Sequence, residues 1–247
     1  MNKKLKAKKY RDRERRKQIR KIKTGIIITT HKKNYEKVKR CMKSIIRYAP
    51  KNRYIILFDN EGCDKNTENI PNIYTEIKYI HVKNQSEGLT YTWNRGIDIC
   101  FENNCDIVIL LNHDTEVNET FKFFIEAIAR KDEIGIYGCT TNNAPFGNHL
   151  NQQSYIKSNT LIVDKIKKDP HGPGGFCLGF SREMLLDNKY DNNNYFDPSY
   201  PWGGNETVFN KRWNKKEGNS YIVRNCFVKH SGDKSWLKCK DRYGKNK

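Results

Sequence analysis

The hydrophobic and polar positions of the chain form two alternating kinds of segment from residue 24 onward. Short apolar runs rich in β-branched residues are typical of buried parallel strands, and apolar residues three and four positions apart are typical of amphipathic helices. The predicted strands are 25–30, 53–58, 79–82, 106–111, 176–180 and 221–230. The predicted helices are 34–48, 89–101, 119–130 and 206–213. This alternation predicts an α/β domain with a mostly parallel central sheet and helices on both faces.

Two long segments interrupt the alternation. Residues 141–172 are polar, and residues 187–205 are dominated by Asn, Asp, Tyr, Pro and Gly, so both are predicted to be mainly loop.

A chain of 247 residues is long enough for one sizeable domain. We expect that domain to span residues 24–240, preceded by a tail at 1–23 and followed by a short tail at 241–247.

The charge of the chain is concentrated in the first tail. Residues 1–23 hold thirteen Lys or Arg and two acids, a balance of +11 out of a net charge of +19 for the chain. Their apolar residues are too sparse to form a helical face. Such a run is consistent with a solvated extension, and equally with one that binds nucleic acid or an anionic membrane weakly. The rest of the chain is a mildly basic domain.

The sequence shows no apolar stretch long enough to span a bilayer and no apolar signal region behind the basic N-terminus. We therefore expect a cytoplasmic protein, with peripheral membrane contact through the tail as an alternative. The eight cysteines form no C-x-x-C pair. Free buried thiols are the better interpretation than a disulfide framework.

Polar residues follow three of the predicted strands. They are Thr29-Thr30-His31, Asp59-Asn60 and Asn112-His113-Asp114. Ligands bind at the carboxyl ends of the strands of an open parallel sheet. Each group alone is consistent with a turn or a helix cap, but their agreement indicates a site. Asp114 is too early to cap the helix near 119, and its carboxylate suits a divalent cation held against a diphosphate.

Two further groups of residues carry candidate chemistry. Trp202-Gly203-Gly204-Asn205-Glu206 combines an aromatic platform for a sugar, two glycines that permit close backbone approach, and a carboxylate. The alternative is a glycine-rich turn with Glu206 in the first turn of a helix, where the helix dipole favours an acid. His230, at the end of the last strand, is a candidate metal ligand, although a lone His is more often structural.

Together these residues resemble family 2 glycosyltransferases, which have the GT-A (Rossmann-like) fold. The resemblance covers roughly residues 24–236 and is carried by the order and spacing of its motifs. The N-terminal motifs are Ile26-Ile27-Ile28-Thr29-Thr30, Asn94-Arg95-Gly96 and Leu110-Leu111-Asn112-His113-Asp114-Thr115, the last an N-x-D form of their D-x-D motif. The segment 202–206 and His230-Ser231-Gly232-Asp233-Lys234 are more similar to β-1,4-galactosyltransferases.

The resemblance implies an inverting hexosyltransferase that uses a nucleotide-sugar donor, with a UDP-sugar favoured, and a glycan, lipid or protein acceptor. The implied donor-binding residues are Thr30, Asp59, Arg95, Asn112 and Asp114. The implied ligands of Mn²⁺ or Mg²⁺ are Asp114 and His230. The implied base is Glu206, with Asp233 as the next candidate, and the implied sugar-binding residues are Trp202, Gly203 and Gly204.

Two departures from the family pattern leave other functions open. Asn112 replaces the first acid of D-x-D, and Glu206 stands where the family has an Asp base, with Asn205 where an acid normally precedes it. A weak or inactive domain that acts as a binding protein through its basic tail is therefore one alternative. A nucleotidyltransferase is another, but segment 29–33 lacks the glycines that such an enzyme usually carries after its first strand.

Overall fold

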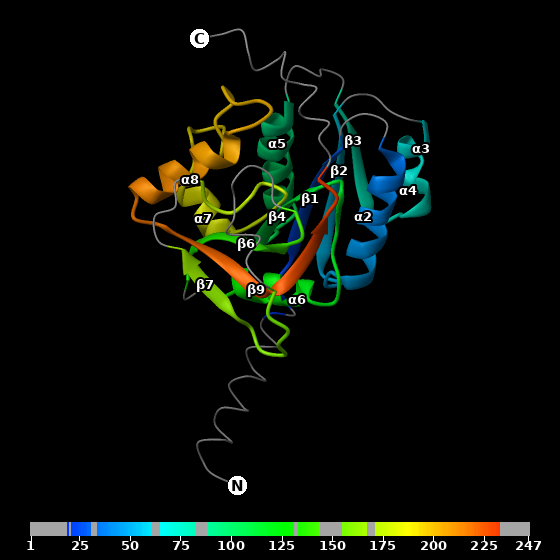
Figure 1. Cartoon of the computed structure of the whole chain (residues 1–247). Coiled ribbons are helices and arrows are strands. Elements are labelled where there is room, and N and C mark those ends of the chain that lie inside the picture. The colour runs from blue at the N-terminus through cyan, green and yellow to red at the C-terminus, as the bar shows by residue number, and fades with distance from the viewer. Residues whose placement is uncertain are drawn as a thin grey trace.

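The strands form one nine-stranded sheet in the part of the chain that the computed structural model describes (Figure 1). The described residues are 19, 21–30, 34–60, 65–82, 88–130, 133–143, 155–166 and 171–232. The sheet order is β3-β2-β1-β4-β8-β6-β9-β5, and β7 pairs with β9. Nearly all of the predicted basic tail, the C-terminal tail, His31, Asp233 and Lys234 lie outside the described residues.

The first half of the sheet is parallel, as the sequence predicts. Strand β1 (Thr24–Thr30) lies between β2 (Arg53–Asp59) and β4 (Ile107–Asn112), and β3 (Ile77–His81) lies outside β2. The apolar residues of β1 and β4 are buried. Parallel pairing brings the carboxyl ends of these strands to one edge, where Thr30 lies opposite Asp59 and Thr29 opposite Asn112.

The second half of the sheet is mixed. Strand β8 (Cys177–Ser181) runs antiparallel to β4, and β6 (Gly135–Thr141) runs antiparallel to β8. Strand β9 (Asn219–His230) is parallel to β6 and pairs with β5 (Thr115–Glu116) and β7 (Val163–Ile166), both antiparallel. The prediction of a parallel sheet is therefore correct for the half in which helices connect consecutive strands. Strands that are connected in other ways need not run parallel.

Helices cover both faces of the sheet (Figure 1). One face packs against α2 (Tyr35–Tyr48), α4 (Ile70–Ile73) and α6 (Phe121–Ile128), with α3 (Lys65–Glu68) beside α2. The other packs against α5 (Gly88–Glu102), α7 (Arg182–Asp187) and α8 (Asn205–Lys215). Ile26 and Ile28 of β1 face the first group, and Ile27 faces the second, as the period of two along a strand requires.

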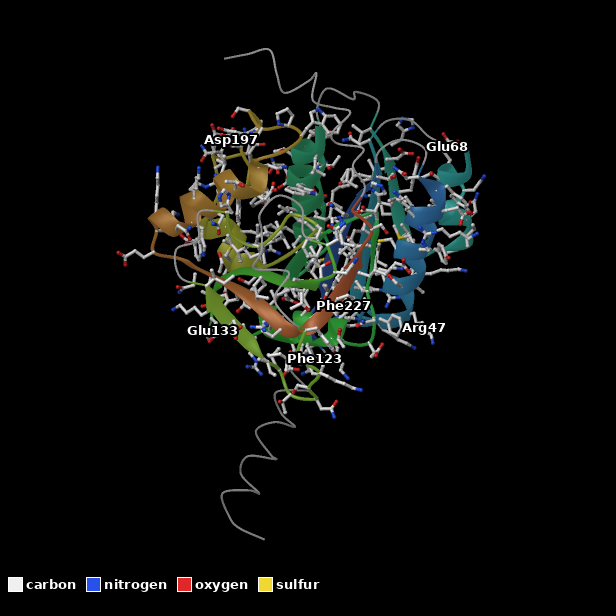
Figure 2. All side chains as sticks on the ribbon, in the orientation of Figure 1. Arg47, Glu68, Phe123, Glu133, Asp197 and Phe227 are labelled. Atoms are coloured by element: carbon white, nitrogen blue, oxygen red, sulfur yellow. The ribbon has the colours of Figure 1, made fainter. Side chains whose placement is uncertain are left out.

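Each face of the sheet has its own core of buried apolar side chains, and Figure 2 draws the side chains of the described residues on the ribbon. Six cysteines of the described chain are buried free thiols: Cys41, Cys100, Cys105, Cys139, Cys177 and Cys226. No described helix combines the length and the apolar character needed to cross a membrane.

A glycine sets how closely α5 approaches the sheet. A Cβ atom at Gly96 would lie 2.8 Å from Cδ1 and 2.9 Å from Cγ2 of Ile27 in β1. Real side chains do not approach this closely, so α5 reaches its position only with glycine here. Close packing of α5 matters for function because its first residue, Gly88, lies near the carboxyl edge of the sheet.

We expect Gly96→Val to lower the free energy of unfolding by about 1–3 kcal/mol, because the added carbons overpack the contact with Ile27. Urea denaturation measures this change. The matched control is Arg95→Ala on the same helix, where an exposed ion pair is removed and a change within about 0.5 kcal/mol is expected. Equal stability of the two variants would contradict the packing argument.

Candidate active site

The carboxyl edge of the parallel strands gathers the predicted donor-binding residues of β1, β2 and β4. Thr30, Asp59 and Asn60 are almost completely buried there. The Tyr79 hydroxyl donates a hydrogen bond of 2.7 Å to Oδ2 of Asp59 and so fixes this carboxylate. Within the described chain, Thr30 Oγ1 and both amide atoms of Asn60 have no hydrogen-bond partner. These atoms could make hydrogen bonds to a ligand at this edge.

Asp114 and His230 meet directly behind this edge. His230 Nε2 lies 3.4 Å from Asp114 Oδ1, and both side chains are about 95% buried. The approach follows from strand pairing, because Thr115 of β5 lies opposite His230 of β9 and Ser231 N donates to Asp114 O at 3.0 Å. The structure therefore brings together the two residues that the sequence predicts as metal ligands.

Three neighbours fix the orientation of the His230 ring. Nδ1 lies 2.7 Å from the carbonyl oxygen of Asn143, which only accepts hydrogen bonds, so Nδ1 carries a proton and donates it. The ring stacks on Phe176, with centroids 5.1 Å apart. The backbone of His230 exchanges hydrogen bonds of 2.9 and 3.1 Å with the amide of Asn142. Nε2 is thereby aimed at Asp114.

Two opposing effects act on the pKa of His230. Burial lowers it more than any other single influence. The hydrogen bond and charge of Asp114, together with the Asn143 carbonyl, outweigh burial, and the pKa is raised above its ordinary value. Asp114 and the Asn143 carbonyl therefore stabilise positive charge at this position.

The donor set of this pair fits a divalent cation. A metal-binding His normally donates its second ring N–H to a carbonyl or carboxylate, which is the arrangement of His230 and Asn143. Mg²⁺ and Mn²⁺ are commonly held by one or two protein ligands together with substrate phosphates. The described residues contain no cluster of three or more His, Cys, Asp or Glu that could hold a metal. The pair suits a cation that the donor diphosphate helps to bind.

Glu206 lies next to Gly175, the residue before the Phe176 that stacks on His230. It is the second residue of α8, whose preceding residue Gly204 has φ +75°, a left-handed conformation that favours glycine. A Cβ atom on Gly175 would lie 3.3 Å from Cδ of Glu206, so the glycine leaves room for the carboxylate. Since Phe176 stacks on His230, residues 175 and 176 connect Glu206 to the Asp114–His230 pair. Burial raises the pKa of Glu206, and a backbone hydrogen bond offsets this only in part.

Hydrogen bonds hold the segment with Trp202, Gly203 and Gly204 against the start of α5. Thr90 N donates to Pro201 O at 3.0 Å, and Thr90 Oγ1 donates to Tyr200 O at 2.5 Å. Asn205 Nδ2 in turn donates to Thr90 Oγ1 at 3.0 Å. Thr90 was not predicted from the sequence, because a single Thr in a helical pattern gives no signal of such contacts. Trp202 and Gly203 are partly exposed beside the site.

The Asn94-Arg95-Gly96 motif has a mainly structural explanation. Asn94 Oδ1 accepts hydrogen bonds from Tyr195 N and Phe196 N, and its Nδ2 donates to Phe196 O and Asn194 Oδ1. The motif therefore holds residues 194–196 against α5. Arg95 is exposed and pairs with Glu102 at 3.5 Å, toward the C-terminal end of α5. The structure does not bring Arg95 to the edge with the others, and its donor-binding role stays a prediction.

Comparison with known proteins identifies the fold and the family. The model of glycosyl transferase family 2 matches residues 25–187, about two thirds of the chain. A crystal structure of GalNAc-T7 with UDP, GalNAc and Mn²⁺ matches with a TM-score of 0.62 and 17% sequence identity. The match covers 86% of this chain and 45% of that one, so the chain spans less than half the length of that protein. No curated protein matches the chain.

These matches support the two halves of the site differently. The structural match shows the GT-A fold, and the family match includes Thr30, Asp59, Arg95, Asn112 and Asp114. The family match ends before Trp202, Glu206 and His230. The resemblance of that C-terminal part to β-1,4-galactosyltransferases therefore stays an expectation.

Glu206→Gln should raise stability at neutral pH, because Glu206 is partly buried and its pKa is raised, so that its ionisation is unfavourable in the folded state. A carboxyl whose folded pKa is raised contributes most to stability below its unfolded pKa, and that contribution is lost as pH rises through the folded pKa. The gain over the unmodified protein should therefore be present at about pH 7 and absent near pH 4. Thermal unfolding at both pH values measures it, and a gain that does not depend on pH would contradict the burial argument.

Proposed function

Because the chain belongs to glycosyl transferase family 2, we propose that it transfers a sugar from a nucleotide-sugar donor to an acceptor hydroxyl, with inversion at the anomeric carbon. The observation that carries the proposal is the buried Asp114–His230 contact beside the ends of β1, β2 and β4. The GT-A-fold structure that matches this chain contains UDP and Mn²⁺, which favours a UDP-sugar and a divalent metal here.

The strand ends would bind the nucleotide. Asp59, held by Tyr79, and the partnerless amide of Asn60 offer an acceptor and a donor to the edge of a base, and Thr30 offers a hydroxyl. Asn112 ends β4 and would face the diphosphate with a neutral side chain in place of an acid. The charge of the bound cation would then be balanced by Asp114 and by the donor itself.

Asp114 and His230 would hold Mn²⁺ or Mg²⁺. Such a cation offsets the charge that develops on a departing diphosphate. The protein contributes a dry, oriented pair of ligands, since His230 is fixed by Asn143 and Phe176 before any ligand arrives. The loss of one acid at Asn112 is compatible with this role because the remaining pair is buried and mutually oriented.

Glu206 would act as the general base. Its raised pKa makes the carboxylate a better proton acceptor, which suits removal of a proton from the attacking hydroxyl. The acceptor oxygen would attack the anomeric carbon from the face opposite the nucleotide. Trp202, Gly203 and Gly204 precede Glu206 on the same segment and would orient a sugar beside it, on a glycan, lipid or protein acceptor.

Asp114→Ala should abolish metal-dependent nucleotide binding while the domain stays folded. Calorimetric titration with UDP, in the presence of Mn²⁺ and then of a chelator, measures the effect. Asp187→Ala is a matched control, because Asp187 is an exposed acid on α7 and makes only a surface ion pair. Asp114→Ala protein that binds UDP with unchanged metal dependence would contradict the assignment.

Glu206→Gln should preserve donor binding and lose most turnover, by about 10²–10⁴-fold, because Gln cannot accept the hydroxyl proton. The loss should fall on kcat rather than on the donor KM. Glu206→Asp should keep partial activity, since it keeps an acid in a site shaped for a longer side chain. Glu183→Gln, which changes an acid in the first turn of α7, is the control. Near-normal transfer by Glu206→Gln would place the base elsewhere.

A further inference from the structure

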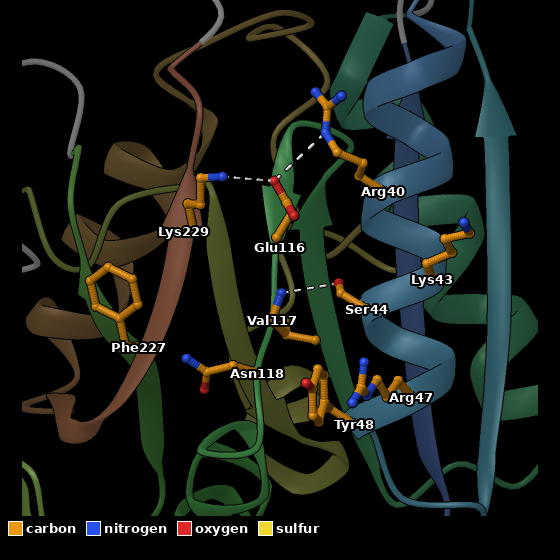
Figure 3. Close-up of a pocket in the computed structure, with 10 residues that line it drawn as sticks. All are labelled: Arg40, Lys43, Ser44, Arg47, Tyr48, Glu116, Val117, Asn118, Phe227 and Lys229. Carbon is orange, nitrogen blue, oxygen red and sulfur yellow. Dashed lines mark hydrogen bonds and ion pairs between the residues drawn. The ribbon is translucent and has the colours of Figure 1, made fainter.

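A basic groove lies outside the site described above, between α2 and β9. It has a volume of about 440 Å³, and β5 and the residues that follow it form its floor (Figure 3). None of the predicted donor, metal or sugar-binding residues lines it. A cavity of this size matches a single small ligand rather than a polymer.

The charge of the groove is strongly unbalanced. Its lining contains four cations, Arg40, Lys43, Arg47 and Lys229, and one carboxylate, Glu116. The cations come from two elements that are distant in sequence, and Figure 3 shows Arg40 on α2 and Lys229 on β9 pointing toward Glu116 from opposite walls. Three of the four cations lie on α2, and Lys229 on β9 adds a positive charge from the facing wall.

Glu116 neutralises only part of this charge. Its Oε1 atom lies 3.1 Å from Lys229 Nζ and 3.7 Å from Arg40 Nε, so one carboxylate oxygen is shared by two cations. Within the described residues, neither Lys43 nor Arg47 forms an ion pair. The floor is fixed independently of these charges, because Val117 N donates to Ser44 Oγ at 3.0 Å. The groove is therefore preformed and electropositive.

Two aromatic residues also line the groove, Tyr48 at the end away from Glu116 and Phe227 along β9, where its ring lies 6.0 Å from the ring of Tyr155. Tyr48 extends from α2 and Phe227 from β9, and both are partly exposed (Figure 3). The Arg47 guanidinium lies 5.1 Å from the centroid of the Tyr48 ring, so one cation is placed next to an aromatic surface. This combination suits a ligand with a flat or apolar ring face and an attached anion.

We propose that the groove is a second binding site, for an oxyanion carried on a sugar ring, such as a sugar phosphate or a uronate. The anion would lie near Arg40 and Lys229 at one end of the groove, and the ring would lie toward Tyr48 and Arg47 at the other. The site does not depend on the proposed transfer reaction, because it shares no residue with the donor site. The one carboxylate of the lining is already paired with two cations, so we expect the ligand to bind without a metal.

The test is calorimetric titration of the full chain. A chelator is present, so that metal-dependent binding at the donor site does not contribute to the measured heat. The probes are glucose 6-phosphate, glucuronate, inorganic phosphate and neutral glucose. Binding of either anionic sugar in preference to glucose supports the proposal, and the two sugars distinguish phosphate from carboxylate as the anion. Glucose binding as tightly as the anionic sugars, or no binding by either of them, overturns it.

Charge-removing variants locate the site. Arg40→Gln combined with Arg47→Gln should weaken anionic sugar binding by about tenfold or more, because two of the four cations that line the groove are removed. Lys211→Gln combined with Lys215→Gln removes the same charge from α8 and should leave the affinity unchanged. Equal weakening by both pairs would show non-specific attraction and overturn the site. Tyr48→Leu should weaken glucose 6-phosphate but not inorganic phosphate, and an equal effect on both would overturn the role of the ring.

Discussion

The site depends on one antiparallel pairing, the short contact of β5 with the end of β9. This pairing places Thr115 opposite His230 and so brings the His230 ring against Asp114. The pair is then supported from outside the strands: Asn142 and Asn143 follow β6 and hold His230, and Phe176 precedes β8 and stacks on it. Segments from four parts of the sheet thus converge on a single buried contact.

The two halves of the sheet contribute different chemistry. The parallel half supplies strand ends with polar atoms that suit a nucleotide, and the mixed half supplies His230 and the approach to Glu206. Helix α5 joins them, since Thr90 and Asn94 bind the loop before α8 while Gly96 lets the helix lie close to β1. Adjacent residues of β9 point to opposite faces of the sheet. His230 therefore points inward to Asp114, and Lys229 points outward to the basic groove.

The sequence predicts this fold best where the signal is local. The buried spacing of Val38, Cys41, Met42 and Ile45 and the apolar run of β4 identify their elements without tertiary information. Strand β7 and helix α7 are too short for a clear period, and the antiparallel direction of β8 depends on contacts distant in sequence. For the site, strand ends identify Asp59 and Asp114, but the approach of His230 to Asp114 was expected only through a family resemblance. Asn143, Phe176 and Thr90 support the site through tertiary contacts. The local sequence pattern around each residue does not predict such contacts.

The central claim is that the Asp114–His230 pair supports metal-dependent release of nucleotide from a sugar donor. The most direct measurement is a donor-hydrolysis assay with the unmodified protein, several nucleotide sugars, and Mn²⁺ or Mg²⁺. We expect one UDP-sugar to release UDP faster than the others, with release stopped by a chelator and restored by added metal. Release that is indifferent to chelation, or no release from any nucleotide sugar with either metal, would contradict the account.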